Sequence, residues 1–219
     1  MAVAGVASYY CHYLTTPRRY PPNMFAMLNA DAAAYSVLNF GVNGATMMRT
    51  GDNPYWGNQE YADALASSPD IVVIMLGTND AKTYQWNQTQ YTADYTDMVK
   101  AFAELTPSPD IYLAVPPPLY AEGTYNMSQK VINIVLPRLI PSIAAENGIP
   151  AANVIDVFSA LGGAGLSRYE YFCDHQSCDN CHPNDAGYSA LAATVYRATV
   201  GFMAPTPTAA GGPVPWVGP

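Results

Sequence analysis

The fold of this chain is decided by one stretch, which reads Ile71-Val72-Val73-Ile74-Met75-Leu76-Gly77-Thr78-Asn79-Asp80. Its first six residues are all apolar and rich in Val and Ile, and Pro69-Asp70 precedes them. Such a run, ended by Gly77, is typical of a strand in a parallel sheet that is buried on both faces. The stretch therefore predicts an α/β protein with this strand near the centre of its sheet.

The polar residues after this strand are placed to carry chemistry. In open α/β sheets, ligands bind at the carboxyl ends of the strands. The side-chain amide of Asn79 would lie at that edge, where it can donate a hydrogen bond to an oxyanion that forms during a reaction. Gly, Thr, Asn and Asp are also all turn-forming residues, so the tetrapeptide alone favours a plain turn.

A second polar cluster lies near the far end of the chain, where Asp179 precedes His182 by three residues and Pro183 follows. An aspartate at this spacing can accept a hydrogen bond from one imidazole nitrogen. That bond fixes the tautomer and supports the charge that forms when the other nitrogen takes a proton. The pair therefore supplies two members of the Ser-His-Asp group of a serine hydrolase. A helix is expected to follow and to end at about Gly201.

Together these blocks resemble the GDSL, or SGNH, family of serine esterases and lipases, and their order along the chain agrees with it. The resemblance runs from about Tyr20 to about Gly201 and includes residues 39–46, which read NFGVNGAT. It implies that the backbone N–H of Gly44 and the side chain of Asn79 belong to the oxyanion hole. It also implies that Asp179 and His182 are catalytic.

The first block of that family, Gly-Asp-Ser followed by Leu or Ile, is missing from the sequence. In its place stands Ala4-Gly5-Val6-Ala7-Ser8. Ser8 is the best candidate for the nucleophile, because it ends the apolar run of the expected first strand, and the resemblance makes its N–H a further oxyanion-hole donor. The alternative is a surface serine without a role. Ser177 is close to His182 in sequence but lacks the strand-to-helix turn that exposes a nucleophile.

Length and composition predict one domain with a tail. A chain of 219 residues, 50% of them hydrophobic, is long enough for one sizeable α/β domain, which we place at residues 1–203. Residues 204–219 are rich in Pro and Gly and are expected to form an extended tail.

The charge balance restricts the partners. Charged residues make up 12% of the chain, the net charge is −8, and the nine Lys and Arg are spread out. This pattern argues against binding nucleic acid through its phosphates. No apolar stretch approaches the ~20 residues that are needed to span a bilayer.

Three of the four cysteines, Cys173, Cys178 and Cys181, lie within nine residues next to His182. Cys178 to His182 matches the pattern of covalent haem attachment. The three cysteines and His175 can instead bind zinc. The simplest hypothesis is a disulfide from Cys173 to Cys178 or Cys181, with no metal and no cofactor.

A disulfide would indicate an oxidising compartment, and the sequons at Asn87 and Asn126 point weakly the same way. The first seven residues lack a positively charged start and are too short for a signal peptide. The hypothesis is therefore a secreted protein or another oxidising compartment. The sequence does not assign a partner to Cys11.

Strands and helices alternate along the chain. Strands are expected at residues 1–7, 35–40, 71–76, 110–115 and 153–158, and helices at 24–29, 60–67, 91–105, 127–147 and 184–201. Pro137 and Pro141 are expected to interrupt the helix at 127–147. This order predicts a three-layer α/β/α sandwich on a flavodoxin-like parallel sheet of about five strands, with right-handed crossovers.

The function implied is hydrolysis of a carboxylic ester, acyl or acetyl, by Ser8, His182 and Asp179. The substrate would be a small-molecule ester or an acylated carbohydrate. The alternative is a non-catalytic relative that keeps the pocket and binds an ester or carbohydrate without turnover. The missing Gly-Asp before the serine separates the two hypotheses, while acyl chain length, alcohol and oligomeric state stay open.

Overall fold

The computed structural model describes residues 2–7, 36–174 and 178–201 of the chain, and for residues 2–7 it describes the backbone alone. The helix expected at residues 24–29 and the tail at 204–219 lie outside the described residues. Within the described ranges, no helix is both long and apolar enough to cross a membrane.

One parallel sheet of five strands, in the order β2-β1-β3-β4-β5, forms the middle of the molecule. The strands are β1 (Ala2–Ala7), β2 (Ser36–Asn39), β3 (Ile71–Met75), β4 (Asp110–Val115) and β5 (Val154–Asp156). The predicted flavodoxin-like sheet is therefore confirmed. In sequence order the chain passes from β1 to β2 on one side and then to β3 on the other side of β1. In open α/β sheets, ligands bind at the carboxyl ends of the two strands where the order reverses in this way, which here are β1 and β3.

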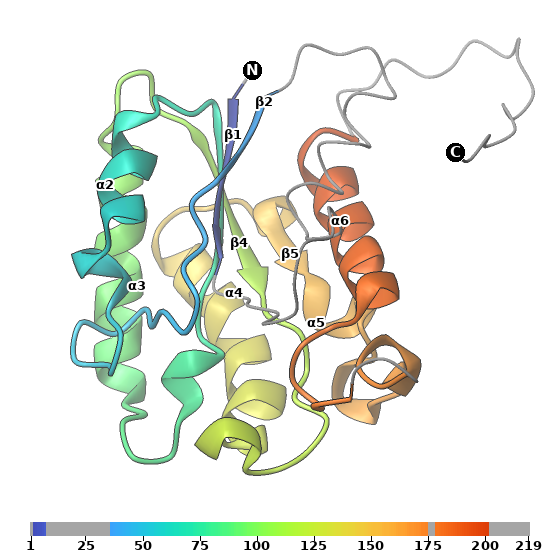
Figure 1. The fold of residues 1–219 in the computed structure, drawn as a ribbon. Coiled ribbons are helices and arrows are strands. Elements are labelled where there is room, and N and C mark those ends of the chain that lie inside the picture. The colour runs from blue at the N-terminus through green and yellow to red at the C-terminus, as the bar shows by residue number, and fades with distance from the viewer. Residues whose placement is uncertain (1, 8–35, 175–177, 202–219) are drawn as a thin grey trace, which may run out of the picture.

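Helices cover both faces of the sheet (Figure 1). They are α2 (Gln59–Ala66), α3 (Gln88–Ala103), α4 (Leu136–Glu146), α5 (Val157–Ala160) and α6 (Asp185–Thr199). Short 3-10 helices span Tyr55–Gly57, Asn79–Ala81, Thr124–Asn126, Ala151–Asn153, Gly163–Gly165 and Tyr169–Tyr171.

Strand β3 supplies side chains to both hydrophobic cores. Val72 and Ile74 pack with residues of α2, α3 and α4, whereas Ile71, Val73 and Met75 pack with residues of α6. Each of these five side chains is at most 2% exposed. Alternate residues of a strand point to opposite faces, so this pattern confirms a strand that is buried on both sides.

Two expected elements differ in kind from those predicted, whereas most others shift at their ends by only one to three residues. The strand expected at residues 153–158 ends at Asp156, whose carboxylate accepts a hydrogen bond from the N–H of Ser159 at 2.9 Å and so starts helix α5. The helix expected at residues 127–147 is a π-helix over Val131–Val135 followed by α4. The change comes just before Pro137, which has no N–H for a regular helical bond and whose ring clashes with the preceding turn.

The backbone after β3 makes a turn that only glycine adopts without strain. Gly77 has φ +139°, and a Cβ at this position would lie 2.7 Å from the hydroxyl oxygen of Tyr91. That hydroxyl donates to the carbonyl of Leu76 at 2.8 Å. The close approach of α3 to the end of β3 therefore requires a residue without a side chain.

We expect Gly77→Ala to lower the free energy of unfolding by about 1–3 kcal/mol, because it combines backbone strain with displacement of the Tyr91 hydroxyl. Urea unfolding followed by circular dichroism measures the change. Gly57→Ala is the matched control, since nothing lies within 4 Å of a Cβ built there. Equal unfolding midpoints for the two variants would contradict the prediction.

Candidate active site

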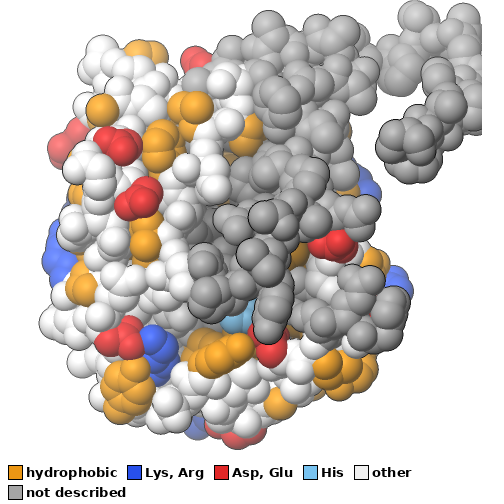
Figure 2. Space-filling view, viewed as in Figure 1, with side chains coloured by type: hydrophobic (Ala, Val, Ile, Leu, Met, Phe, Trp, Pro, Cys, Tyr) orange, Lys and Arg blue, Asp and Glu red, His pale blue; other side chains and the backbone are white. Residues whose placement is uncertain are grey.

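Asp179 and His182 lie in contact on the loop that precedes α6. Oδ2 of Asp179 is 2.5 Å from Nδ1 of His182, and Oδ1 accepts the N–H groups of Cys181 at 2.9 Å and of His182 at 2.7 Å. The His182 side chain is 23% exposed, and Figure 2 shows a histidine at the surface beside hydrophobic and acidic side chains. Because Nδ1 is in contact with Asp179, Nε2 is the ring nitrogen that remains to take or give a proton.

The surroundings of Asp179 favour its charged form. Burial raises the pKa of this carboxyl, but hydrogen bonds from the ring and N–H of His182 and from the N–H of Cys181 outweigh it and lower the pKa to about 2. The hydroxyl of Tyr125 also donates to Oδ2, at 3.2 Å. At neutral pH the carboxylate can therefore support a positive charge on the neighbouring imidazole.

The loop that carries this pair is fixed at both ends. The N–H of Tyr120 donates to the carbonyl of Asn180 at 2.8 Å. On the other side, Asn184 accepts from the N–H of Gly187 at 3.0 Å, which caps α6, and its amide donates to the carbonyl of Glu170 at 2.7 Å. The geometry of Asp179 and His182 therefore depends on neighbours that lie far from them in the sequence.

The cysteine cluster contains a disulfide between Cys173 and Cys178, so the disulfide hypothesis is confirmed. This bond uses the sulfur of Cys178 that the haem and zinc alternatives both need, while His175 and Cys11 lie outside the described residues. Cys181 is a free thiol and only 4% exposed. The disulfide is compatible with an oxidising compartment.

Gly44 and Asn79 follow the two strands that flank β1. Gly44 lies beyond β2 with φ +71°, a left-handed conformation that glycine adopts readily. Asn79 is the first residue of the 3-10 helix Asn79–Ala81, directly after the Gly77 turn. Both residues therefore lie at the carboxyl edge of the sheet, where the sequence predicted a ligand site.

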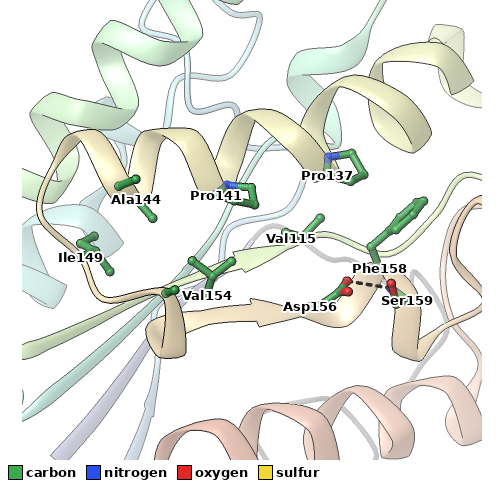
Figure 3. Close-up of a pocket in the computed structure, with 11 residues that line it drawn as sticks. Val115, Pro137, Pro141, Ala144, Ile149, Val154, Asp156, Phe158 and Ser159 are labelled. Atoms are coloured by element: carbon green, nitrogen blue, oxygen red, sulfur yellow. Dashed lines mark hydrogen bonds between the residues drawn. The ribbon is translucent and has the colours of Figure 1, made fainter.

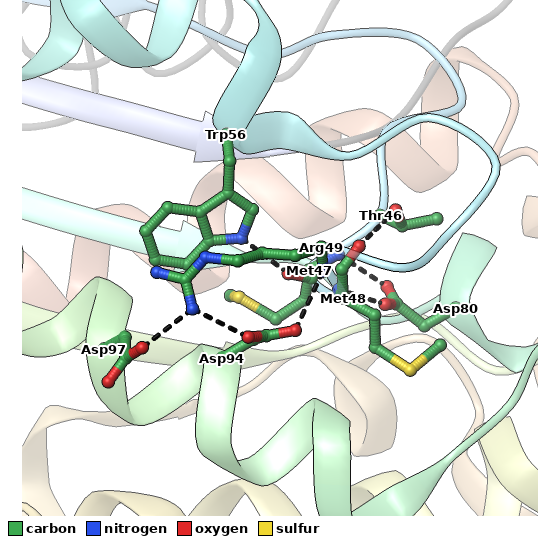
Figure 4. A network of polar contacts seen from close by, with 8 residues as sticks. All are labelled: Thr46, Met47, Met48, Arg49, Trp56, Asp80, Asp94 and Asp97. Atoms are coloured by element: carbon green, nitrogen blue, oxygen red, sulfur yellow. Dashed lines mark hydrogen bonds and ion pairs between the residues drawn. The ribbon is translucent and has the colours of Figure 1, made fainter.

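Asp80 joins these two loops, and sequence reasoning assigned it no role. Its carboxylate is fully buried and accepts the N–H groups of Met47 at 2.9 Å and Met48 at 2.7 Å, as Figure 4 shows. Burial raises the pKa of Asp80 to about 7, against the opposing effect of these two donors. The contact fixes the segment after Gly44 to the residue next to Asn79. The local signal was a charged residue in the short polar segment that follows a buried strand.

Further side chains brace the same loops. Gln85 donates to the carbonyl of Asn79 at 2.8 Å and accepts the N–H of Asp52 at 2.9 Å. Arg49 stacks on the ring of Trp56, with its guanidinium carbon 3.7 Å from the ring centroid, and forms ion pairs with two acidic residues of α3 (Figure 4). These contacts hold the segment after Gly44 against α3 and against the loop of Asn79.

The predicted nucleophile, Ser8, and the alternative, Ser177, both lie outside the described residues. Ser8 is the residue after Ala7, the last residue of β1, and Ala7 is aligned with Met75 of β3. Strand β1 lies between β2 and β3. Its carboxyl end therefore lies between the strands that lead to Gly44 and Asn79.

A cavity of about 550 Å³ lies elsewhere, between α4 and the edge strand β5 (Figure 3). Its wall is mostly apolar and includes Pro137, Pro141, Val154 and Phe158. None of the predicted site residues that the structure describes lines this cavity.

Comparison of the whole sequence with known proteins gives a family match and a similar esterase. Residues 3–190 match the GDSL-like lipase/acylhydrolase family. An acetylxylan esterase from Xylanibacter ruminicola is 30% identical to the chain over 182 residues. The match covers 75% of this chain, which spans only 35% of the length of that relative.

Solved structures share the fold at lower identity. The acetyl xylan esterase AlAXEase superposes with a TM-score of 0.67 at 17% identity, over 91% of this chain and 100% of that one. Est24, a carbohydrate acetylesterase from Sinorhizobium meliloti, gives a TM-score of 0.67 at 17% identity, over 92% and 99% of the two chains. Because the family match covers most of the sequence, this chain belongs to the GDSL-like lipase/acylhydrolase family.

Proposed function

We propose that this chain hydrolyses acetyl esters carried by carbohydrates, through a Ser-His-Asp mechanism with Ser8 as the nucleophile. The observation that carries the proposal is the contact between Asp179 and His182, in which both carboxylate oxygens accept hydrogen bonds. Such a pair is the part of a serine hydrolase that activates the nucleophile. The position of Ser8 directly after β1, an inner strand of the sheet, supports it as the third member.

In the proposed mechanism, the hydroxyl oxygen of Ser8 attacks the ester carbonyl while Nε2 of His182 takes the hydroxyl proton. The tetrahedral intermediate collapses, Nε2 gives the proton to the departing alcohol, and an acyl-enzyme remains. Water then attacks the acyl group while Nε2 takes a proton from the water. Nε2 gives this proton to the oxygen of Ser8, and the acid departs. Throughout, Asp179 orients the ring and stabilises its positive charge.

The oxyanion of the intermediate would accept hydrogen bonds from the side chain of Asn79 and the N–H groups of Gly44 and Ser8. The buried bonds of Asp80 to the segment after Gly44 support this assignment, because they hold two of the three donors at a fixed separation. Donors fixed in advance stabilise developing charge without reorganising during the reaction.

An acetylated carbohydrate is proposed as the substrate because of the relatives. The 30% identical relative is an acetylxylan esterase, and two matching structures are an acetyl xylan esterase and a carbohydrate acetylesterase. The second candidate function is binding of an ester or carbohydrate without turnover. It is favoured by the altered first block, in which Val6 and Ala7 precede Ser8. Activity measurements distinguish the two.

We expect the wild type to release acetate from 4-nitrophenyl acetate and from acetylated xylan, and His182→Ala to lower kcat by at least about 10³-fold. Ser8→Ala should lower kcat by a similar factor, because neither Ser8 nor His182 can carry out the proposed mechanism without the other. Retained activity in Ser8→Ala would show that another residue is the nucleophile. A folded but inactive wild type would favour binding without turnover.

Asn79→Ala should lower kcat by about 10²–10³-fold with little change in KM, since the amide would act mainly on the oxyanion of the transition state. Steady-state kinetics measures both constants. Asn58→Ala is the control, because the Asn58 amide donates to the carbonyl of Pro54 beside the 3-10 helix Tyr55–Gly57. A rise in KM alone for Asn79→Ala would assign the residue to ground-state binding instead.

Asp179 should also make stability depend on pH. Its pKa is about 2 in the folded protein and about 3.9 in an unfolded chain. A lowered folded pKa contributes stability that is complete above the unfolded pKa and is lost as the pH falls through the folded one. We therefore expect Asp179→Asn to be less stable than wild type at pH 6, with the difference shrinking between about pH 4 and pH 2 in urea unfolding. A difference that grows on acidification would contradict this.

A further inference from the structure

Tyr125 has a backbone conformation that bulky residues rarely adopt. Within the 3-10 helix Thr124–Asn126 its φ is 51° and its ψ is 33°. The next residue, Asn126, has φ 62°. This left-handed region favours glycine, so a tyrosine stays there only because its surroundings hold it in place.

Hydrogen bonds to the loop of Asn79 hold this turn. The N–H of Thr83 donates to the carbonyl of Asn126 at 2.9 Å, and the N–H of Ser128 donates to the carbonyl of Ala81 at 2.9 Å. The two segments are thus paired antiparallel around Lys82 and Met127, directly after the turn. Tyr125 therefore has a fixed position relative to the proposed oxyanion hole.

The side chain of Tyr125 reaches the Asp179–His182 pair and is still accessible. Its hydroxyl donates to Oδ2 of Asp179 at 3.2 Å, and its ring centroid lies 5.5 Å from that of His182, with the two planes at 65°. The residue is nevertheless 54% exposed. The polar tip is thus anchored, while much of the apolar ring faces solvent beside the imidazole.

The alcohol part of an ester substrate must lie in this region. Nε2 of His182 gives a proton to the departing alcohol, so that oxygen and the group attached to it lie next to the imidazole. An anchored aromatic ring there offers an apolar surface that loses little conformational freedom on binding. The faces of a sugar ring carry C–H groups that can pack on such a surface, whereas a small alkyl alcohol has no comparable face.

We propose that Tyr125 determines specificity for the alcohol part of the substrate, by packing its ring against the saccharide that carries the acetyl group. This inference rests on the proposed function. The hydroxyl bond to Asp179 serves to hold the ring in place.

The test compares kcat/KM for two acetyl esters, acetylated xylobiose and ethyl acetate, by titrating the acid that is released. Tyr125→Gly removes the ring and also relieves the left-handed backbone. We expect it to lower the ratio of kcat/KM for the sugar ester to that for the ethyl ester by roughly three- to tenfold, mainly through KM. Tyr125→Phe keeps the ring on the same backbone turn, which the bonds of Asn126 and Ser128 still hold, and should keep most of the ratio.

Tyr84→Ala is the matched control, because Tyr84 is 63% exposed and its hydroxyl also donates to a carboxylate, that of Asp52 at 2.7 Å. It should leave the ratio unchanged. Thermal unfolding of each variant separates loss of specificity from loss of structure. Glycine at position 125 should keep or raise Tm, because it adopts the left-handed conformation without strain.

An unchanged ratio in Tyr125→Gly would overturn the inference. The inference would also be overturned if Tyr125→Gly and Tyr125→Phe each lowered kcat/KM for the two esters by the same factor. That result would mean that the residue only positions Asp179. A wild type that hydrolyses neither ester would instead overturn the proposed function, and this inference with it.

Discussion

The buried carboxylate of Asp80 is the contact on which the arrangement of the site depends. It accepts the N–H groups of Met47 and Met48 in a fully buried environment. Without the carboxyl, two backbone N–H groups would lack partners, and without these N–H groups the buried carboxyl oxygens would lack hydrogen bonds; both are costly. Each side therefore requires the other. The loop with Gly44 and the loop with Asn79 are joined as a result, although they follow different strands.

Other loop contacts extend this connection across the edge of the sheet. Gln85 binds the carbonyl of Asn79, Thr83 binds the turn that contains Tyr125, and Tyr125 reaches Asp179. The parallel strands bring their carboxyl ends to one edge, which sets the positions of the loops only coarsely. Side-chain bonds between the loops then set the fine geometry that chemistry needs.

Most of the fold could be predicted from local patterns. The apolar run from Ile71 to Leu76 identified a strand buried on both faces, and the alternation of elements gave the sheet. One error lay where a single residue overrides such a pattern, since Asp156 caps a helix within an apolar segment that predicted only a strand. An interruption of the helical segment at Pro137 was predicted, but not the π-helix over Val131–Val135 that precedes it.

The candidate site could be predicted only in part. The spacing of Asp179 and His182 is local, and their contact follows from a single turn. The roles of Gly44 and Asn79 came from resemblance to a family. Asp80 and Tyr125 were missed because their partners are 32 to 54 residues away in the sequence, a distance at which no periodicity operates.

The placement of Cys181 bears on the durability of the neighbouring disulfide. A thiol attacks a disulfide only as the thiolate, so a rise in its pKa slows exchange. Burial raises the pKa of Cys181, and the negative charge of Asp179 raises it further. Burial, helped by the carboxylate that orients His182, therefore keeps the adjacent thiol protonated and slows its attack on the disulfide between Cys173 and Cys178.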